Sequence, residues 1–286
     1  MPVPSPHSVY AWEVAPTPRP LPVVEPDLDV AEAERLAARD IWRVNPSDAP
    51  AGGPLQPLSA EWFKYLESKR YRRHGRWLPK FLEFTRHARE SLVAVGDGLG
   101  FDWVRYAEGG AEVTVVDPSA DRLRLLRTHF DARGVNAQLV QAPFDHLPFG
   151  DSRIDVVCAV FNEPPLVPWV SALAEGFRIL RPGGKILVVL PSKYNAFRLQ
   201  TMLMPWRRFF VHERRVPGKF KRHELREAFS AFADVHVYKR HLRRSELPYV
   251  WRWMPLPVLE RVMGRFLVVK AFKPLFAGST SVRSAA

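Results

Sequence analysis

Short apolar runs alternate with amphipathic segments through the middle of the chain. Apolar runs bounded by glycine or polar residues predict strands, whereas apolar residues at helical spacing predict helices. The predicted strands are Leu92–Val95, Glu112–Val116, Ala137–Gln141, Ile154–Phe161 and Lys185–Leu190. The predicted helices between them are Phe101–Glu108, Asp121–Ala132 and Pro168–Leu180. Such alternation predicts an α/β fold with a mainly parallel sheet covered on both faces.

The flanking segments have different patterns, and they divide the chain into four parts. Residues 1–57 are predicted to be a Pro-rich tail with a short helix at Asp29–Arg43, and residues 58–90 a helical lead-in. In the lead-in, Ser59 is placed to cap one helix, and a second helix is predicted at Trp77–His87. Residues 91–192 form the predicted α/β core. Residues 193–286 are predicted to be a basic cap with a helix and two antiparallel edge strands, at Arg222–Phe232, Val235–Tyr238 and Phe266–Ala271.

A glycine-rich turn follows the first predicted strand. Gly96, Asp97, Gly98, Leu99 and Gly100 lead directly into a helix, so the backbone can turn tightly and present free N–H groups to a ligand. Phe101 stands where nicotinamide-binding proteins usually carry a third glycine, which argues against that cofactor.

An aspartate ends the second predicted strand. Asp117 lies where a carboxylate can accept hydrogen bonds from ribose hydroxyls beside the glycine turn. The alternative is a turn residue, because Asp-Pro-Ser is a common turn sequence.

Four segments, which follow one another along the chain, resemble those of class I S-adenosylmethionine-dependent methyltransferases of type 11. They cover about a hundred residues. They are Gly96–Gly100, Val113–Asp117, Leu147–Phe149 followed by Ile154–Val157, and Glu175–Gly184, which ends in Leu-Arg-Pro-Gly-Gly. The resemblance implies a Rossmann-like three-layer sandwich of seven strands in the order 3-2-1-4-5-7-6, with strand 7 antiparallel.

The resemblance also implies S-adenosyl-L-methionine as the cofactor and assigns residues to it. The glycine turn would meet the methionine part, Pro118 would pack on the adenine, and Phe144 would flank it. Val160, at the end of the fourth strand, completes the expected cofactor site. Glu163 is the candidate catalytic base, because it follows this strand and would face the transferred methyl group; the alternative is an exposed loop carboxylate.

Two positions depart from the family pattern. Ala94 stands where the family commonly has an acidic residue near the cofactor's ammonium group, and Pro143 stands where an aspartate commonly binds the adenine. Asp97 or Asp102 are candidates to replace the first carboxylate. These departures raise the alternative of a relative that binds cofactor without catalysis.

The charge of the chain is concentrated in its last part. The net charge of +12 arises wholly within residues 201–286, which hold 18 Lys/Arg and 6 Asp/Glu. A basic segment with many aromatic residues indicates an anionic partner, which could be a membrane surface or nucleic acid; a packed cap with a solvated basic face is the alternative. The substrate is expected to contact this part, which contains Trp206, Phe209, Phe210, Tyr249, Trp251 and Trp253.

We therefore expect methyl transfer to a small-molecule or lipid-like acceptor. A nucleic-acid methyltransferase is the second hypothesis, and a cofactor-binding protein without activity is the third. The single cysteine, Cys158, excludes an internal disulfide and lies in a predicted buried strand. Histidine spacing predicts no metal site. The absence of a signal peptide pattern and of a long apolar run favours a cytoplasmic protein, with peripheral membrane attachment as an option.

Overall fold

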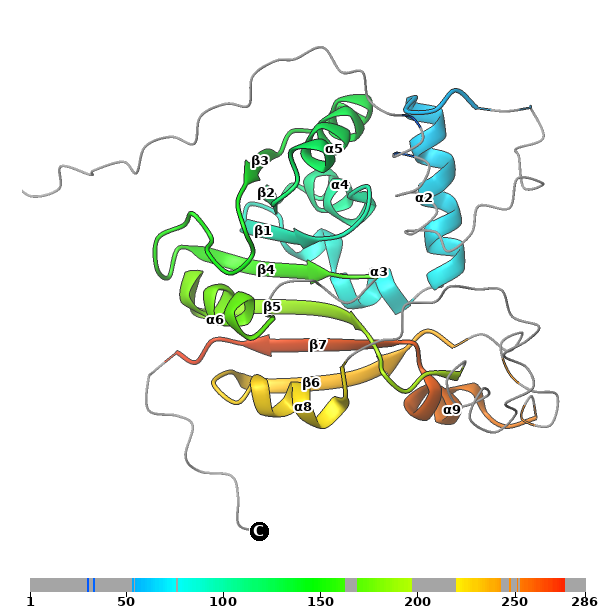
Figure 1. The fold of residues 1–286 in the computed structure, drawn as a ribbon, viewed down its shortest axis with the longest axis vertical. Helices are drawn as coiled ribbons and strands as arrows, with labels where there is room; N and C mark the ends of the chain where they lie inside the picture. Colours follow the sequence, from blue (N-terminus) through cyan, green and yellow to red (C-terminus); the bar gives the residue numbers. More distant parts are fainter. Residues whose placement is uncertain are drawn as a thin grey trace, which may run out of the picture.

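A computed structural model defines a seven-stranded sheet between two layers of helices (Figure 1). The structure describes residues 53, 55–75, 77–162, 169–196, 220–242 and 253–275, together with residues 30, 33, 247 and 251. The predicted Pro-rich tail and most of its helix at Asp29–Arg43 lie outside these residues.

The sheet confirms the expected fold class and strand order. Its spatial order is β3-β2-β1-β4-β5-β7-β6. The strands β1 to β5 are parallel, and β7 runs antiparallel to both β5 and β6. The bounds are β1 Ser91–Gly96, β2 Glu112–Asp117, β3 Gln138–Gln141, β4 Ile154–Val160, β5 Leu180–Pro191, β6 Ala233–Arg240 and β7 Phe266–Phe272.

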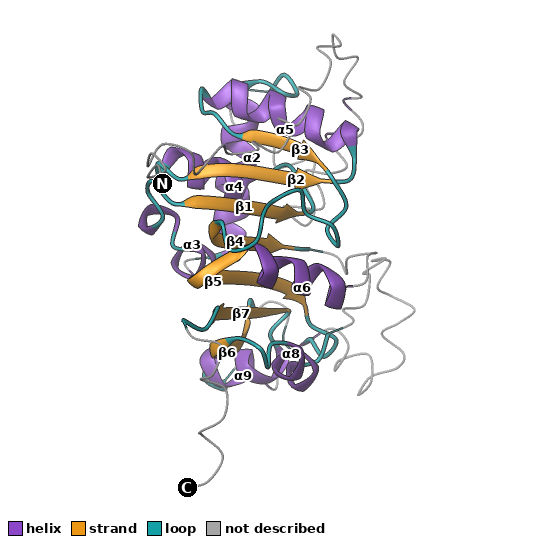
Figure 2. Ribbon diagram, turned by 90° about the vertical axis from the view of Figure 1, so that its left-hand side faces the viewer, coloured by secondary structure: helices purple, strands orange, loops and turns teal. Residues whose placement is uncertain are grey.

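Alternate residues of the central strands face opposite helical layers. Val93 and Val95 pack on the side of α6 (Trp169–Ile179) and α8 (Arg222–Ala228). Leu92 and Ala94 pack on the side of α3 (Trp77–Leu82), α4 (Phe101–Glu108) and α5 (Ala120–Arg133). Figure 2 shows the sheet edge-on between these layers. A period of two in burial is what a sheet covered on both faces requires.

The lead-in helix α2 (Ala60–His74) begins where the sequence predicts. The Ser59 side chain accepts a hydrogen bond from the backbone N–H of Trp62 at 3.2 Å, as an N-cap does. One face of α2 buries Phe63 and Leu66 against Leu99, Phe101 and Leu125, so this helix packs directly on the glycine turn and on α5.

Three local predictions differ from the structure. The helix predicted at Trp77–His87 ends at Leu82, and a short 3-10 turn, η2 (Phe84–Arg86), follows, because Glu83 has a left-handed backbone with φ of 56°. Its carboxylate turns to Lys185 and Lys270, at 2.8 and 2.9 Å. The helix predicted at Arg222–Phe232 ends at Ala228. A further helix, α9 (Leu256–Met263), was not predicted.

Candidate functional site

The glycine turn connects β1 to α4 at the carboxyl edge of the parallel strands. A Cβ atom on Gly96 would lie 2.1 Å from the backbone oxygen of Val160, and one on Gly100 would lie 2.4 Å from Leu126 Cδ2. Gly100 also has φ of 73°, which other residues rarely adopt. Glycine is therefore required at position 96 by the close approach of the Val160 backbone and is favoured at position 100 by its positive φ.

Asp97 ties this turn to the chain that leaves β4. Its backbone N–H donates to the oxygen of Val160 at 3.2 Å. Its Oδ1 accepts from the backbone N–H of Asn162 at 2.7 Å and from the Asn162 side chain at 3.2 Å. Since Glu163 follows Asn162, Asp97 holds the first residues of the segment that carries the predicted base. Glu163 itself lies outside the described residues.

Asp102, the other candidate to replace the missing carboxylate, faces α2. It is buried and pairs with Arg70 Nη2 at 2.5 Å, and it accepts a hydrogen bond from the Tyr71 hydroxyl at 2.8 Å. Burial raises the pKa of the Tyr71 hydroxyl, and the Asp102 charge raises it further, so the phenol stays protonated and donates. Asp102 therefore anchors the lead-in helix to the start of α4.

Asp117 lies level with the glycine turn. The paired residues Val95 and Val116 immediately precede Gly96 and Asp117, so the register of β1 and β2 places the turn and the carboxylate side by side. Oδ1 of Asp117 accepts from the backbone N–H of Ser119 at 2.7 Å and from Arg122 Nη2 at 2.9 Å. Burial raises the pKa of Asp117, whereas the neighbouring Arg122 acts to lower it.

The other residues expected to bind the cofactor differ in whether their side chains are exposed. Pro118, directly after Asp117, is exposed at the edge. The Leu99 side chain is fully buried, so only its backbone belongs to the turn. Phe144 is also buried: its ring packs edge-on against Phe161 at 5.8 Å rather than standing free over the edge. The role of Phe144 at the adenine stays a prediction, and the sequence could not give the direction of its ring.

His129 supports the turn from α5 and was not identified in the sequence. Its Nδ1 lies 2.7 Å from the backbone oxygen of Leu99. Because a carbonyl oxygen only accepts, Nδ1 carries the proton. Burial lowers the pKa of His129 to about 4, so the ring is neutral near pH 7, and it stacks on Phe63 at 4.1 Å. The only sequence signal is its place on the apolar face of a helix, which by itself indicates a core residue.

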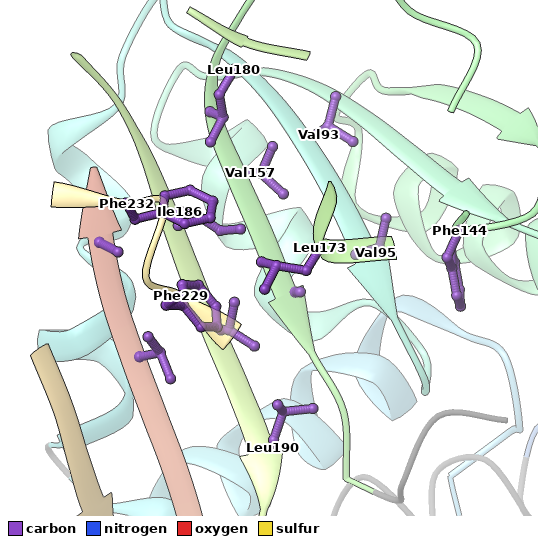
Figure 3. Close-up of a cluster of buried hydrophobic side chains, with 14 of the residues drawn as sticks. Val93, Val95, Phe144, Val157, Leu173, Leu180, Ile186, Leu190, Phe229 and Phe232 are labelled. Carbon is purple, nitrogen blue, oxygen red and sulfur yellow. The ribbon is translucent and has the colours of Figure 1, made fainter. Parts of the chain in front are cut away.

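An apolar cavity lies between the sheet and α6 and reaches the ends of β1 and β4. The space in it that the centre of a water-sized sphere can occupy is about 60 Å³. Figure 3 shows three of the lining side chains, Leu173, Val95 and Phe144, near one another. The side chains of the described lining residues are all apolar. The lining residues are Val95, Phe144, Leu147, Val157, Ala159, Phe161, Trp169, Ala172, Leu173, Gly176, Ile186, Val188 and Leu190.

Other candidate chemistry can be placed as well. The Cys158 thiol is buried, 3.6 Å from the Tyr106 hydroxyl, and burial raises its pKa, so it is a core residue. Among the described residues, His, Cys, Asp and Glu side chains form no group that could hold a metal ion. Of the aromatic residues expected near the substrate, Trp251 and Trp253 are described; Trp206, Phe209, Phe210 and Tyr249 lie outside the described residues.

Comparison with known proteins identifies a relationship of this site. Residues 93–184 match a family model described as a methyltransferase domain. This part of the chain is therefore similar to methyltransferase domains. The matched residues of this methyltransferase domain include the glycine turn, Asp117 and Val160, and they end in the Arg-Pro-Gly-Gly segment of β5.

Curated relatives and solved structures agree with this family. The domain is similar to the ubiquinone/menaquinone biosynthesis C-methyltransferase UbiE of Stutzerimonas stutzeri, with 33% identity over 42% of this chain and 49% of the relative. It is also similar to the demethylmenaquinone methyltransferase of Thermus thermophilus, with 34% identity over 32% of this chain and 42% of that protein. The chain thus spans about half the length of these relatives, or less.

The solved structures share the fold at low identity. A SAM-dependent methyltransferase from Aquifex aeolicus has a TM-score of 0.52 and 13% identity, and the match covers 75% of this chain and 98% of that one. A SAM-dependent methyltransferase from Methanosarcina mazei has a TM-score of 0.50 and 18% identity, covering 70% and 99%.

Proposed function

We propose that this chain transfers the methyl group of S-adenosylmethionine to an apolar small-molecule acceptor with a flat ring of the quinone type. The observation that carries the proposal is the apolar cavity beside the glycine turn. The described residues that line it offer aromatic and aliphatic surface without a charged side chain, which suits a ring rather than a nucleotide or a peptide. The names of the curated relatives, which refer to ubiquinone and menaquinone, point to the same class of acceptor.

The residues at the carboxyl edge fit the cofactor's nucleoside. The contact between Gly96 and Val160 leaves no room for a side chain, so the backbone can approach the ligand there. Among the described residues, the hydrogen bonds to the Asp117 carboxylate reach Oδ1, and we assign Oδ2 to the ribose hydroxyls. The exposed ring of Pro118 then meets the adenine. Gly98, Leu99 and Gly100 contribute backbone, and Phe144 contributes a wall behind the adenine.

Asp97 is the carboxylate we assign to the ammonium group in place of the acid missing at Ala94. Ala94 is fully buried in the core under α3 and α4, and its methyl side chain offers no carboxylate to a ligand. Asp102 is paired with Arg70 and Tyr71 of α2. Asp97 remains at the turn, between the ends of β1 and β4.

Bound S-adenosylmethionine supplies an electrophilic methyl group, which needs alignment with the acceptor and exclusion of water. The chain provides alignment through the cavity walls and through the Asp97–Asn162 contact, which holds the start of the segment after β4. Glu163 is the proposed base for a proton released by the acceptor ring.

The test combines binding with turnover. The full chain should bind S-adenosylmethionine and its demethylated product in a calorimetric titration. It should also move labelled methyl from the cofactor into a reduced naphthoquinone. Filling the cavity with Ala172→Leu should lower methyl transfer at least ten-fold without changing cofactor affinity. Ala174→Leu places the same side chain on the exposed side of the same helix and serves as the control.

Each other outcome has a defined meaning. Cofactor binding without transfer to any quinol would identify the non-catalytic relative, which the replacements at Ala94 and Pro143 suggest. Labelling of RNA or DNA in place of the quinol would favour the nucleic-acid hypothesis. Equal activity of the Ala172→Leu and Ala174→Leu proteins would remove the cavity from the site.

A further inference from the structure

The helix α9 exposes an apolar surface that the sheet does not cover. Val258 and Val262 are one turn apart and are 49% and 58% exposed. Trp253, two residues before Pro255 at the start of the helix, is 80% exposed. Pro255 and Pro257 are exposed as well. Leu259 and Met263, on the opposite side, are buried against Ala196 and Leu242 and fasten the helix to the body.

The exposed charged side chain of α9 is positive. Arg261, the only exposed charged residue of α9, lies between the two valines in sequence. The single acid of the helix, Glu260, turns inward: its carboxylate accepts from the backbone N–H of His241 at 2.7 Å and lies 3.5 Å from Arg240. The surface therefore combines exposed apolar groups with positive charge, within a segment, 201–286, whose formal charge is +12.

The position of α9 relates this surface to the candidate site. Pro191, at the end of β5, pairs with Phe266, three residues after α9 ends. The carboxyl ends of β1, β4 and β5 lie at the same edge of the sheet, so α9 shares this edge with the glycine turn and the cavity (Figure 1).

We propose that the surface formed by Trp253, Pro255, Pro257, Val258, Arg261 and Val262, called here the α9 face, docks on an anionic lipid bilayer. Tryptophan and valine enter the boundary between headgroups and acyl chains, and arginine pairs with lipid phosphates. Charge complementarity selects the bilayer over a neutral apolar protein. Docking there would bring the carboxyl ends of the parallel strands close to acceptors dissolved in the membrane. The docking proposal itself does not depend on methyl transfer.

The experiment is co-sedimentation of the full chain with lipid vesicles. One set contains phosphatidylcholine alone, and the other contains equal parts of phosphatidylcholine and phosphatidylglycerol. We expect binding to the anionic vesicles and little to the neutral ones. Raising the ionic strength to molar salt should weaken binding several-fold, because the Debye length falls to about 3 Å.

The decisive variant is V258S/V262S, which makes the α9 face polar without touching the core. It should bind anionic vesicles about ten-fold more weakly, because serine gains much less than valine on leaving water for the acyl chains. Val170→Ser is the matched control, because Val170 is 62% exposed on α6 and lies outside the α9 face. This control should bind as the parent does, and thermal unfolding should show that both proteins are folded.

Three results would overturn the proposal. The first is equal binding to both vesicle types or to neither. The second is equal loss in the V258S/V262S and Val170→Ser proteins. The third is a concentration-dependent dimer that V258S/V262S converts to monomer, because the α9 face would then be an interface between two copies of the chain. None of these results bears on cofactor binding, which is measured without lipid.

Discussion

At the scale of single residues, the carboxylate of Asp117 is the group on which cofactor recognition is expected to depend. It is buried, and the strand register places it level with the glycine turn. Replacing it by an isosteric amide keeps an acceptor for the Ser119 N–H but removes the charge that strengthens bonds to ribose hydroxyls.

Asp117→Asn should weaken binding of S-adenosylmethionine by about 1–3 kcal/mol, which is roughly 5- to 150-fold. Titration calorimetry on the full chain measures this change. Arg122→Gln is the control, since it removes the ion pair at Oδ1 and leaves the carboxylate in place. Unchanged affinity in the Asp117→Asn protein would remove this residue from the cofactor site.

His129 should make stability depend on pH below neutrality. Burial lowers its pKa from 6.5 to about 4, so the unfolded chain binds a proton more readily than the folded chain between these values. The free energy of unfolding therefore falls as the pH falls from about 6.5 toward 4, by up to about 3 kcal/mol in total.

Urea unfolding between pH 7.5 and 5 measures this dependence. Arg178 lowers the pKa of Glu175 to about 2, so protonation of Glu175 changes the stability only below this pH range. His129→Gln should flatten the profile, because the amide can still donate to the Leu99 oxygen without titrating. His236→Gln, at an exposed site on β6, should leave the profile as it is. A steep profile in the His129→Gln protein would contradict the assignment.

At the scale of elements, α2 is attached to the cofactor turn by a buried ion pair. Arg70 and Asp102 have side chains 3% and 4% exposed, and Tyr71 adds a hydrogen bond to the same carboxylate. Because Asp102 lies in the first turn of α4, a change on α2 can reach the glycine turn without touching it.

Arg70→Met should cost about 3–5 kcal/mol of stability, since it leaves a buried carboxylate with too few partners. The double variant R70M/D102N should recover most of this loss because it removes the uncompensated charge. Urea unfolding compares the two proteins. If the double variant were as unstable as the single one, packing rather than charge would account for the loss.

The elements also show what the sequence could and could not predict. Strands β1, β2 and β4 are apolar runs ended by glycine or polar residues, so their pattern alone was sufficient. The order of the strands required the family resemblance. The sequence could not show that the predicted helix ends before Glu83. The contacts that favour this end come from Lys185 and Lys270, which lie 102 and 187 residues away in the chain. The helix α9 was missed because two prolines and a short length hide its period.

For the candidate site, positions along the chain could be predicted from the sequence, but the contacts between elements could not. The glycine turn and Asp117 follow strands directly, so their places came from the strand pattern. Phe144 was located along the chain, but its ring turned inward because Phe161 and α6 offer an apolar surface there. The roles of His129, Arg70 and Asp102 arise from contacts between helices that are distant in sequence.

At the scale of the whole molecule, Glu83 connects the lead-in to two strands, β5 and β7, that follow it by 102 and 187 residues at the contacting lysines. Burial alone would raise the pKa of its carboxyl, but hydrogen bonds and charge from Lys185 and Lys270 lower it. The carboxylate therefore contributes stability above pH 4.5, and this contribution is lost as the pH falls through the lowered value.

Glu83→Gln should reduce the free energy of unfolding by about 1–3 kcal/mol at neutral pH, because two half-buried lysines lose their shared partner. Guanidinium unfolding measures the change, and cofactor affinity should stay constant since Glu83 lies at the amino edge. Glu61→Gln, on the exposed face of α2, is the control. Equal stability of the Glu83→Gln and Glu61→Gln proteins would show that the ion pairs of Glu83 contribute nothing to the free energy of unfolding.

The place of β7 has a consequence for how the protein is made. Its residues, Phe266–Phe272, separate β5 from β6 in the finished sheet, although they follow both strands along the chain and are synthesised after them. Until then, the nascent chain presents the open backbone edge of β5, which other chains could join. Synthesis that stops before Phe266 would leave this edge permanently open and favour aggregation, even though the glycine turn and Asp117 were already in place.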